Sequence, residues 1–102
     1  MVSTEAIRSW LVGGAYPNPF DNRTTILVDV PEPSHVRLEV FDSIGRRVAL
    51  LGDEAVPAGL RPYFLEADGL SAGVYLYRLS AVSAVSPGEL VQETRKLIRA
   101  RD

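Results

Sequence analysis

The sequence contains no cysteine and only one histidine among its 102 residues. The absence of cysteine excludes disulfide bonds, zinc–thiolate sites and thiol catalysis. Apolar runs are only a few residues long, too short for a helix that crosses a membrane. The formal net charge is -2, with 11 basic and 13 acidic residues, so we expect no nucleic-acid partner for the domain as a whole.

Residue patterns typical of catalytic and ligand sites are also missing. His35 follows Pro33 and Ser34 at the start of an expected strand, and a surface position explains it better than a role as base or metal ligand. No glycine-rich loop opens a helix to hold a phosphate. Acidic residues that could pair for glycoside hydrolysis sit in or beside expected turns, namely Asp53, Glu54, Glu66 and Asp68. We therefore expect no catalysis, no metal and no cofactor.

What the sequence does contain is alternation. Val36, Leu38 and Val40 alternate with Arg37 and Glu39, and a period of two indicates a half-buried strand. With 46% apolar residues, the chain is typical of a folded domain with one two-layer core.

Turn residues divide the chain into short strands. Asp42 to Gly45 fits a tight turn, so Arg46 to Leu51 is expected to pair with the preceding strand. Further strands are expected at Thr24 to Val30, Arg61 to Glu66, Val74 to Val82 and Leu90 to Arg99. The sequence predicts an all-β fold, an immunoglobulin-like antiparallel β-sandwich of about seven strands. Residues 1–15 are expected to form a linker and a first short strand, and residues 16–102 the domain itself.

Two features of the expected strands leave alternatives open. Aromatic side chains are expected mostly in the core, namely Trp10, Tyr16, Tyr63, Phe64, Tyr75 and Tyr77. Basic residues concentrate near the end of the chain, at Arg95, Lys96, Arg99 and Arg101. By charge alone they are more simply explained as protection of an edge strand than as a recognition strip for an acidic partner or anionic head groups. The long apolar segment 82–88 leaves the register of the last strand open.

Several motifs follow one another in a recognisable order. They are Tyr16-Pro17-Asn18-Pro19-Phe20, Arg23-Thr24-Thr25-Ile26, Val36-Arg37-Leu38-Glu39-Val40-Phe41-Asp42, Ile44-Gly45-Arg46-Arg47-Val48, Pro57-Ala58-Gly59, Leu70-Ser71-Ala72-Gly73-Val74-Tyr75-Leu76-Tyr77-Arg78-Leu79 and Thr94-Arg95-Lys96-Leu97-Ile98. In this order they resemble the type A C-terminal sorting domain of the type IX (Por) secretion system. The resemblance covers residues 16–101.

The resemblance implies a non-catalytic signal that directs an attached cargo protein out of a Gram-negative cell. The implied partners are the type IX translocon, a sortase-like peptidase and a preceding cargo domain. The implied route passes through the periplasm and ends at the outer membrane, at the cell surface or in the medium. The first residues lack the pattern of a signal peptide, which by this analogy belongs to the cargo. Cleavage would fall between Val2 and Tyr16.

Carried over residue by residue, the resemblance marks three parts of the signal. They are Pro17, Asn18 and Pro19; Gly73, Tyr75 and Arg78; and Arg95, Lys96, Leu97 and Arg99. The first two parts are better explained by folding roles, because proline fixes φ and glycine permits a tight turn. For the basic part the resemblance favours recognition.

Two other classes of function remain open. A structural module similar to the flagellar hook-capping immunoglobulin-like domain would assemble into a filament-associated complex. A carbohydrate-binding accessory domain of a hydrolase would need an exposed aromatic platform. An edge strand could also pair two copies in a homodimer.

Overall fold

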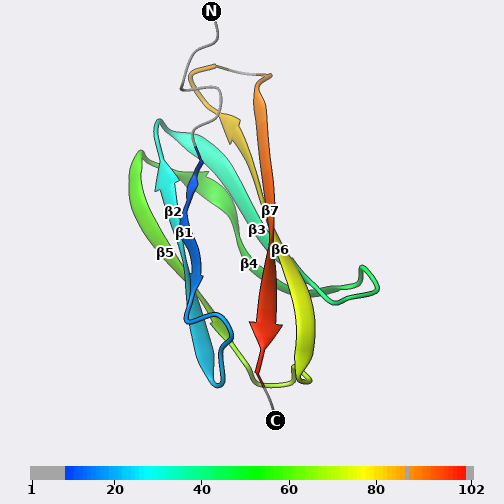
Figure 1. The fold of residues 1–102 in the computed structure, drawn as a ribbon. Helices are drawn as coiled ribbons and strands as arrows, with labels where there is room; N and C mark the ends of the chain where they lie inside the picture. The colour runs from blue at the N-terminus through cyan, green and yellow to red at the C-terminus, as the bar shows by residue number, and fades with distance from the viewer. Residues whose placement is uncertain (1–8, 87, 101–102) are drawn as a thin grey trace, which may run out of the picture.

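Seven strands make up most of the computed structural model, which describes residues 9–86 and 88–100 (Figure 1). The strands are β1 (Leu11–Tyr16), β2 (Arg23–Val30), β3 (Ser34–Phe41), β4 (Arg47–Val56), β5 (Gly59–Glu66), β6 (Gly73–Ser83) and β7 (Leu90–Arg99). No helix in this described part of the chain is long and apolar enough to cross a membrane. The predicted all-β class is confirmed.

The strands form two antiparallel sheets that pack face to face. One sheet has the order β1-β2-β5, and the other has the order β4-β3-β6-β7. The chain crosses between sheets after β2, after β4 and after β5, which is an immunoglobulin-like arrangement. The start of β1 and the end of β7 lie at opposite ends of the sandwich (Figure 1).

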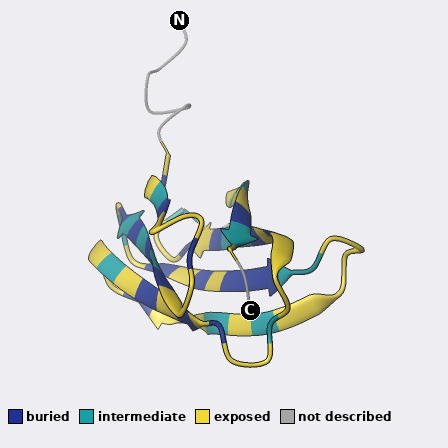
Figure 2. Cartoon of the chain, turned by 60° about the horizontal axis from the view of Figure 1, so that its bottom comes forward, coloured by how far each residue is buried: buried dark blue, intermediate teal, exposed yellow. Residues whose placement is uncertain are grey.

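The core is built by the inward-facing half of each strand. Val36, Leu38 and Val40 of β3 are fully buried, as their alternation predicts, and they face Ile26 and Val28 of β2 across the sandwich. The same alternation appears as bands of buried and exposed residues along the strands in Figure 2. Burial of these β-branched and aliphatic side chains supplies the main stabilising free energy.

Strand β4 differs from the expectation. It runs to Val56 and not to Leu51, so Asp53 and Glu54 lie in a strand and not beside a turn. The carboxylate of Asp53 accepts a 2.6 Å hydrogen bond from His35 and lies 3.5 Å from Arg37, both on β3. These cross-strand contacts and the exposure of the edge strand allow acidic residues in a sheet, against their low strand propensity. Glu66 ends β5.

The last hairpin is regular. Strands β6 and β7 pair from Gly73 with Arg99 to Val82 with Leu90 without a shift in register. The apolar segment before β7 therefore lengthens the hairpin loop and leaves the strand in place. Its exposed members include Val82 and Val85.

The six aromatic residues that are expected mostly in the core divide into two groups. Trp10, Tyr63, Tyr75 and Tyr77 are buried, as predicted. The other two, Tyr16 and Phe64, are exposed outside the core, and the guanidinium of Arg23 lies 4.9 Å from the centre of the Phe64 ring.

A truncation in β3 tests this description of the core. Leu38→Ala is expected to lower the free energy of unfolding by about 2–5 kcal/mol, because it leaves a cavity at a fully buried position. Leu60→Ala, at a position that is 65% exposed, is the matched control and should cost less than about 0.5 kcal/mol. Urea denaturation measures both, and equal losses would contradict the packing described.

Candidate sorting-signal surface

The three parts of the expected signal come from the β1–β2 loop, from β6 and from β7. Strands β6 and β7 are neighbours in one sheet, whereas the loop belongs to the opposite sheet. The loop nevertheless reaches the free side of β7, where Phe20 forms a parallel bridge with Arg99. Tertiary structure therefore brings together segments that are about 80 residues apart in the sequence.

The side-chain amide of Asn18 pairs with the backbone of β7 in the way that a neighbouring strand would. Its Nδ2 donates a 3.1 Å hydrogen bond to the carbonyl of Lys96, and its Oδ1 accepts a 3.0 Å bond from the amide of Ile98. An amide side chain offers one donor and one acceptor side by side, as a peptide group does. Asn18 thus satisfies backbone groups on an edge that would otherwise be open.

Phe20 continues the same pairing with its backbone. Its amide donates to the carbonyl of Ile98 at 2.9 Å, and its carbonyl accepts from the amide of Ala100 at 2.8 Å. The hydroxyl of the fully buried Thr24 donates to the carbonyl of Pro17 at 2.7 Å, which ties the loop to β2. The peptide bonds before Pro17 and Pro19 are cis. Proline has no amide hydrogen, so neither proline leaves a donor unpaired.

A substitution at Asn18 tests the pairing. Asn18→Ala removes both hydrogen bonds and is expected to lower the free energy of unfolding by about 1 kcal/mol and to speed amide exchange at Ile98. Asn22→Ala in the same loop is the control, because Asn22 bonds Ala67 through its backbone carbonyl. Urea denaturation and hydrogen exchange measure the two effects. An unchanged Ile98 exchange rate in Asn18→Ala would refute the role of the side chain.

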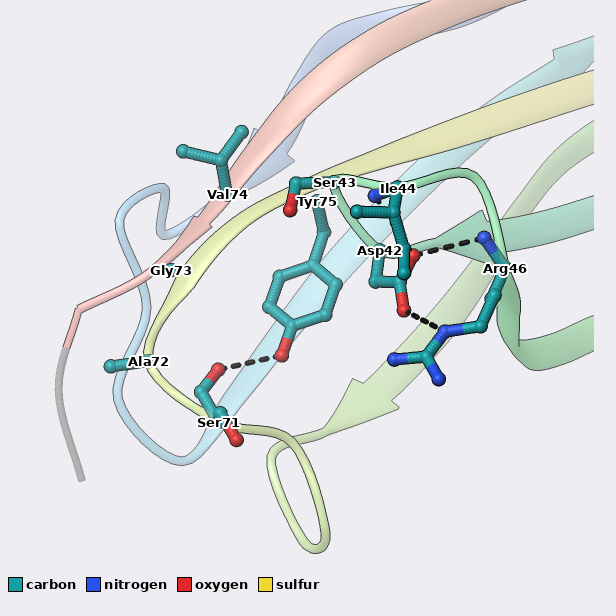
Figure 3. Close-up of a pocket in the computed structure, with 9 residues that line it drawn as sticks. All are labelled: Asp42, Ser43, Ile44, Arg46, Ser71, Ala72, Gly73, Val74 and Tyr75. Atoms are coloured by element: carbon teal, nitrogen blue, oxygen red, sulfur yellow. Dashed lines mark hydrogen bonds and ion pairs between the residues drawn. The ribbon is translucent and has the colours of Figure 1, made fainter.

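Gly73 and Tyr75 lie at the start of β6, beside the β3–β4 turn. The Tyr75 hydroxyl donates a 2.6 Å hydrogen bond to the carbonyl of Ser71, which closes the turn that leads into the strand (Figure 3). Gly73 has a φ of 144°, a conformation that favours glycine. Together with the turn they line a hollow of about 250 Å³. Both residues thus shape the turn that leads into β6.

Arg78 lies in the middle of β6, on the outer face of its sheet. Its guanidinium is 3.3 Å from the carboxylate of Glu39 and 4.8 Å from the centre of the Phe41 ring. Arg47 approaches the same carboxylate at 3.1 Å. Glu39 is buried although it lies on an outer face, because these two guanidinium groups cover it. Arg78 is held by β3 and is not a freely extended charge.

Asp42 organises the turn opposite Gly73. Its carboxylate accepts hydrogen bonds from the amides of Arg46 and Ile44 and from the Arg46 guanidinium. The Arg46 amide is the largest cause that lowers the pKa of Asp42 below its usual value of 3.8, and desolvation opposes it. The charged carboxylate is thus the form that the folded turn stabilises.

Acid should weaken this turn. Because the folded-state pKa of Asp42 is lowered, its contribution to stability is present above about pH 3.8 and is lost as the pH falls below that value. Asp42→Asn is therefore expected to be less stable than the unmodified protein at pH 7, with a smaller difference at pH 3. Arg46→Gln retains both amide hydrogen bonds to Asp42. Its free energy of unfolding should therefore still fall between pH 7 and pH 3, but by less than that of the unmodified protein. Urea midpoints at the two pH values measure this, and a constant difference would argue against it.

The basic residues of β7 do not form one strip. Successive side chains of a strand point to opposite faces, so Arg95, Leu97 and Arg99 share the inner side, whereas Lys96 faces outward. Leu97 is fully buried in the core. Arg95 donates a 3.0 Å hydrogen bond to the hydroxyl of Ser9, so it is occupied within the fold. Lys96, the only lysine in the sequence, is exposed. Arg101 lies outside the described residues.

Two residues that sequence analysis did not assign to the signal adjoin it. Tyr16 is 81% exposed and directly precedes Pro17. Its position next to Ala15, which is buried, places it on the outer side of β1 by strand alternation. Glu93 of β7 contacts the segment that leads into β1. Alternation within β1 could have indicated Tyr16, whereas no sequence signal pairs Glu93 with its partners.

The acidic and histidine residues weighed for catalysis are dispersed. His35 is exposed and paired with Asp53, and Glu66 lies 2.6 Å from Arg23. Among residues 9–86 and 88–100, no three histidine or acidic side chains are grouped so that they could hold a metal ion.

Comparison with known proteins was made on the whole chain. The family described as the secretion system C-terminal sorting domain matches residues 14–95. The chain belongs to this family. The match includes the first two parts of the signal and Arg95, whereas Lys96, Leu97 and Arg99 lie just beyond it. No curated protein matches the chain, and no solved structure matches it. Membership in the type IX sorting family implies export toward the outer membrane, the cell surface or the medium.

Proposed function

We propose that this domain is a folded export signal that the type IX translocon recognises and that a sortase-like peptidase separates from its cargo. The observation that carries the proposal is the meeting of all three motif segments around β6 and β7, with Asn18 joining the first segment to the third. A recognition surface made in this way exists only in the folded domain. The proposed division places residues 1–15 as linker and first short strand, and residues 16–102 as the sorting domain.

The polarity of the sandwich supports this assignment. A cargo domain would precede β1, at one end of the sandwich, and the β1–β2 loop, the start of β6 and the end of β7 lie toward the other end (Figure 1). From Glu93, beside the start of β1, to Arg99 is six residues of strand, or about 20 Å. A receptor could therefore approach the β1–β2 loop and the end of β7 without meeting the cargo first. In this proposal the domain passes through the periplasm with its cargo.

Lys96 is the charge that we propose for direct recognition. It is exposed, it belongs to the third motif segment, and its carbonyl receives the Asn18 bond that fixes the backbone there. Arg95 and Arg78 are already occupied by Ser9 and by Glu39. An outward cation on a fixed backbone suits an acidic site on a receptor.

Pairing of two copies through an edge strand remains a proposal. The bonds at Lys96, Ile98 and Ala100 indicate that even-numbered residues of β7 direct their backbone groups to the free side. The loop already occupies that side near the end of the strand. A homodimer through β7 would therefore use the part from Leu90 to Thr94.

A reporter fusion tests the function. The reporter precedes this chain and is expressed in cells with and without a working type IX translocon. We expect the reporter at the surface or in the medium only when the translocon works. A folded domain whose reporter stays in the periplasm of both strains would overturn the proposal and favour a structural module.

A matched pair of variants tests the role of Lys96 in the same fusion. Lys96→Gln is expected to lower export about fivefold, which corresponds to roughly 1 kcal/mol in receptor affinity. Gln92→Glu, on the same face of the same strand, also lowers the net charge by one and should export normally. Both should unfold at nearly the same urea concentration as the unmodified domain. Equal export by the two variants would remove Lys96 from the recognition site.

A further inference from the structure

The segment that joins the sandwich to any preceding chain is held by side chains of β7. The carboxylate of Glu93 accepts hydrogen bonds from the Trp10 amide at 2.7 Å, the Ser9 hydroxyl at 2.8 Å and the Leu11 amide at 3.4 Å. Arg95 donates to the same Ser9 hydroxyl at 3.0 Å. We name this group of five residues, Ser9, Trp10, Leu11, Glu93 and Arg95, the junction clamp.

The clamp joins the two sheets. On its other side, the carbonyl of Trp10 accepts a 2.7 Å hydrogen bond from the amide of Asp29 in β2. Trp10 and Leu11 are buried in the core. The backbone from Trp10 onward is therefore fixed by β2 and by Glu93 at once. Bonds that end on a carboxylate are stronger than neutral ones.

Close packing continues this fixation along β1. A Cβ added at Gly14 would be in ordinary van der Waals contact, 3.4 Å from the Tyr77 hydroxyl and 3.7 Å from Arg95. Burial raises the pKa of Tyr77, while its hydrogen bond with the Ala15 backbone and the charge of Arg95 lower it in part. Strand β1 is thus in contact with β6 and β7 beyond the clamp itself.

We propose that the junction clamp sets the position at which the cargo is cut from this domain, and that Glu93 is the residue that sets it. A peptidase needs several residues in an extended and unpaired form, so it cuts a folded chain only where the backbone opens. The clamp holds the amides of Trp10 and Leu11, and Leu11, Ala15 and Tyr16 pair with β2, with a shift in register between Leu11 and Ala15. Processing is therefore confined to the chain that precedes Trp10. The role in cargo cleavage rests on the proposed function, whereas the protection of the junction by Glu93 does not.

The clamp also makes the junction depend on the last strand. Glu93 and Arg95 belong to β7. The peptide bonds after Ser9 are therefore protected from cleavage only while β7 is paired in its sheet. Strand β7 carries the third part of the signal and also holds the junction through the clamp. A domain whose last strand has not folded would be open to cleavage within β1.

Limited digestion of the purified chain by proteinase K, followed by mass spectrometry, tests the proposal without any translocon. The unmodified chain should give a stable fragment that begins no later than Trp10. In Glu93→Ala, cleavage between Leu11 and Ala15 should be about tenfold faster, because proteolysis follows the population of the locally open form. Glu89→Ala removes the same charge from the β6–β7 loop and is the control, with the fragment of the unmodified chain expected.

Two readouts keep the test decisive. Amide exchange at Leu38 and Leu79 in the core should stay unchanged in Glu93→Ala, which separates local opening from loss of the fold. If Glu93→Ala is digested throughout, Glu93→Gln is used, because its amide oxygen still accepts from Trp10, and an intermediate rate is expected. The proposal is overturned if the unmodified chain is trimmed past Leu11. It is also overturned if Glu93→Ala or Glu93→Gln is cut no faster than the control Glu89→Ala.

A second arm uses the reporter fusion in secreting cells. The C-terminus of the exported reporter is read by mass spectrometry and should fall at or before Ser9. A reporter that ends between Leu11 and Tyr16 would overturn the proposal. If no reporter is exported, the proposed function fails, while the digestion still decides whether Glu93 closes the junction.

Discussion

The free side of β7 is the constraint on which the rest of the structure depends. A final strand at the edge of a sheet presents unpaired N–H and C=O groups that must find partners or be protected. Near the end of β7 the chain meets this need with its own β1–β2 loop from the opposite sheet, and at the other end a side-chain contact holds the segment before β1. Glu93 receives Trp10 at one end, and Asn18 with Phe20 pairs with Ile98 at the other. The two contacts join the sheets along the side where β1 runs beside β7 (Figure 1).

This arrangement gives several motif residues a role within the fold. Asn18 is a motif residue, yet both of its side-chain hydrogen bonds are made within the fold. Tyr75 and Arg78 likewise bind Ser71 and Glu39. Motif residues that hold the backbone determine where the remaining exposed groups stand. A receptor that reads those exposed groups would read the motif indirectly.

The surface left for a partner is small and mixed in character. Lys96 supplies a charge on the outer side of one sheet, and Tyr16 supplies a large exposed ring on the outer side of the other, beside the two prolines of the loop. Aromatic residues with a fixed backbone lose little conformational entropy on binding, and they are frequent centres of protein interfaces. A surface of this kind fits recognition by another protein better than a deep pocket for a small ligand.

The sequence by itself determined the strands and their faces, because a period of two and turn residues act over a few neighbouring positions. The alternation of Val36 to Val40 and the full extent of β7 from Leu90 to Arg99 follow from that local information. Motif order also sufficed for the family. Only the tertiary structure decided that β4 continues to Val56, that Arg95 is occupied while Lys96 is exposed, and that Asn18 and Glu93 hold β7 from opposite ends. These outcomes depend on contacts between residues about 20 to 80 positions apart, and hydrogen bonds over such distances leave no periodic trace in a sequence.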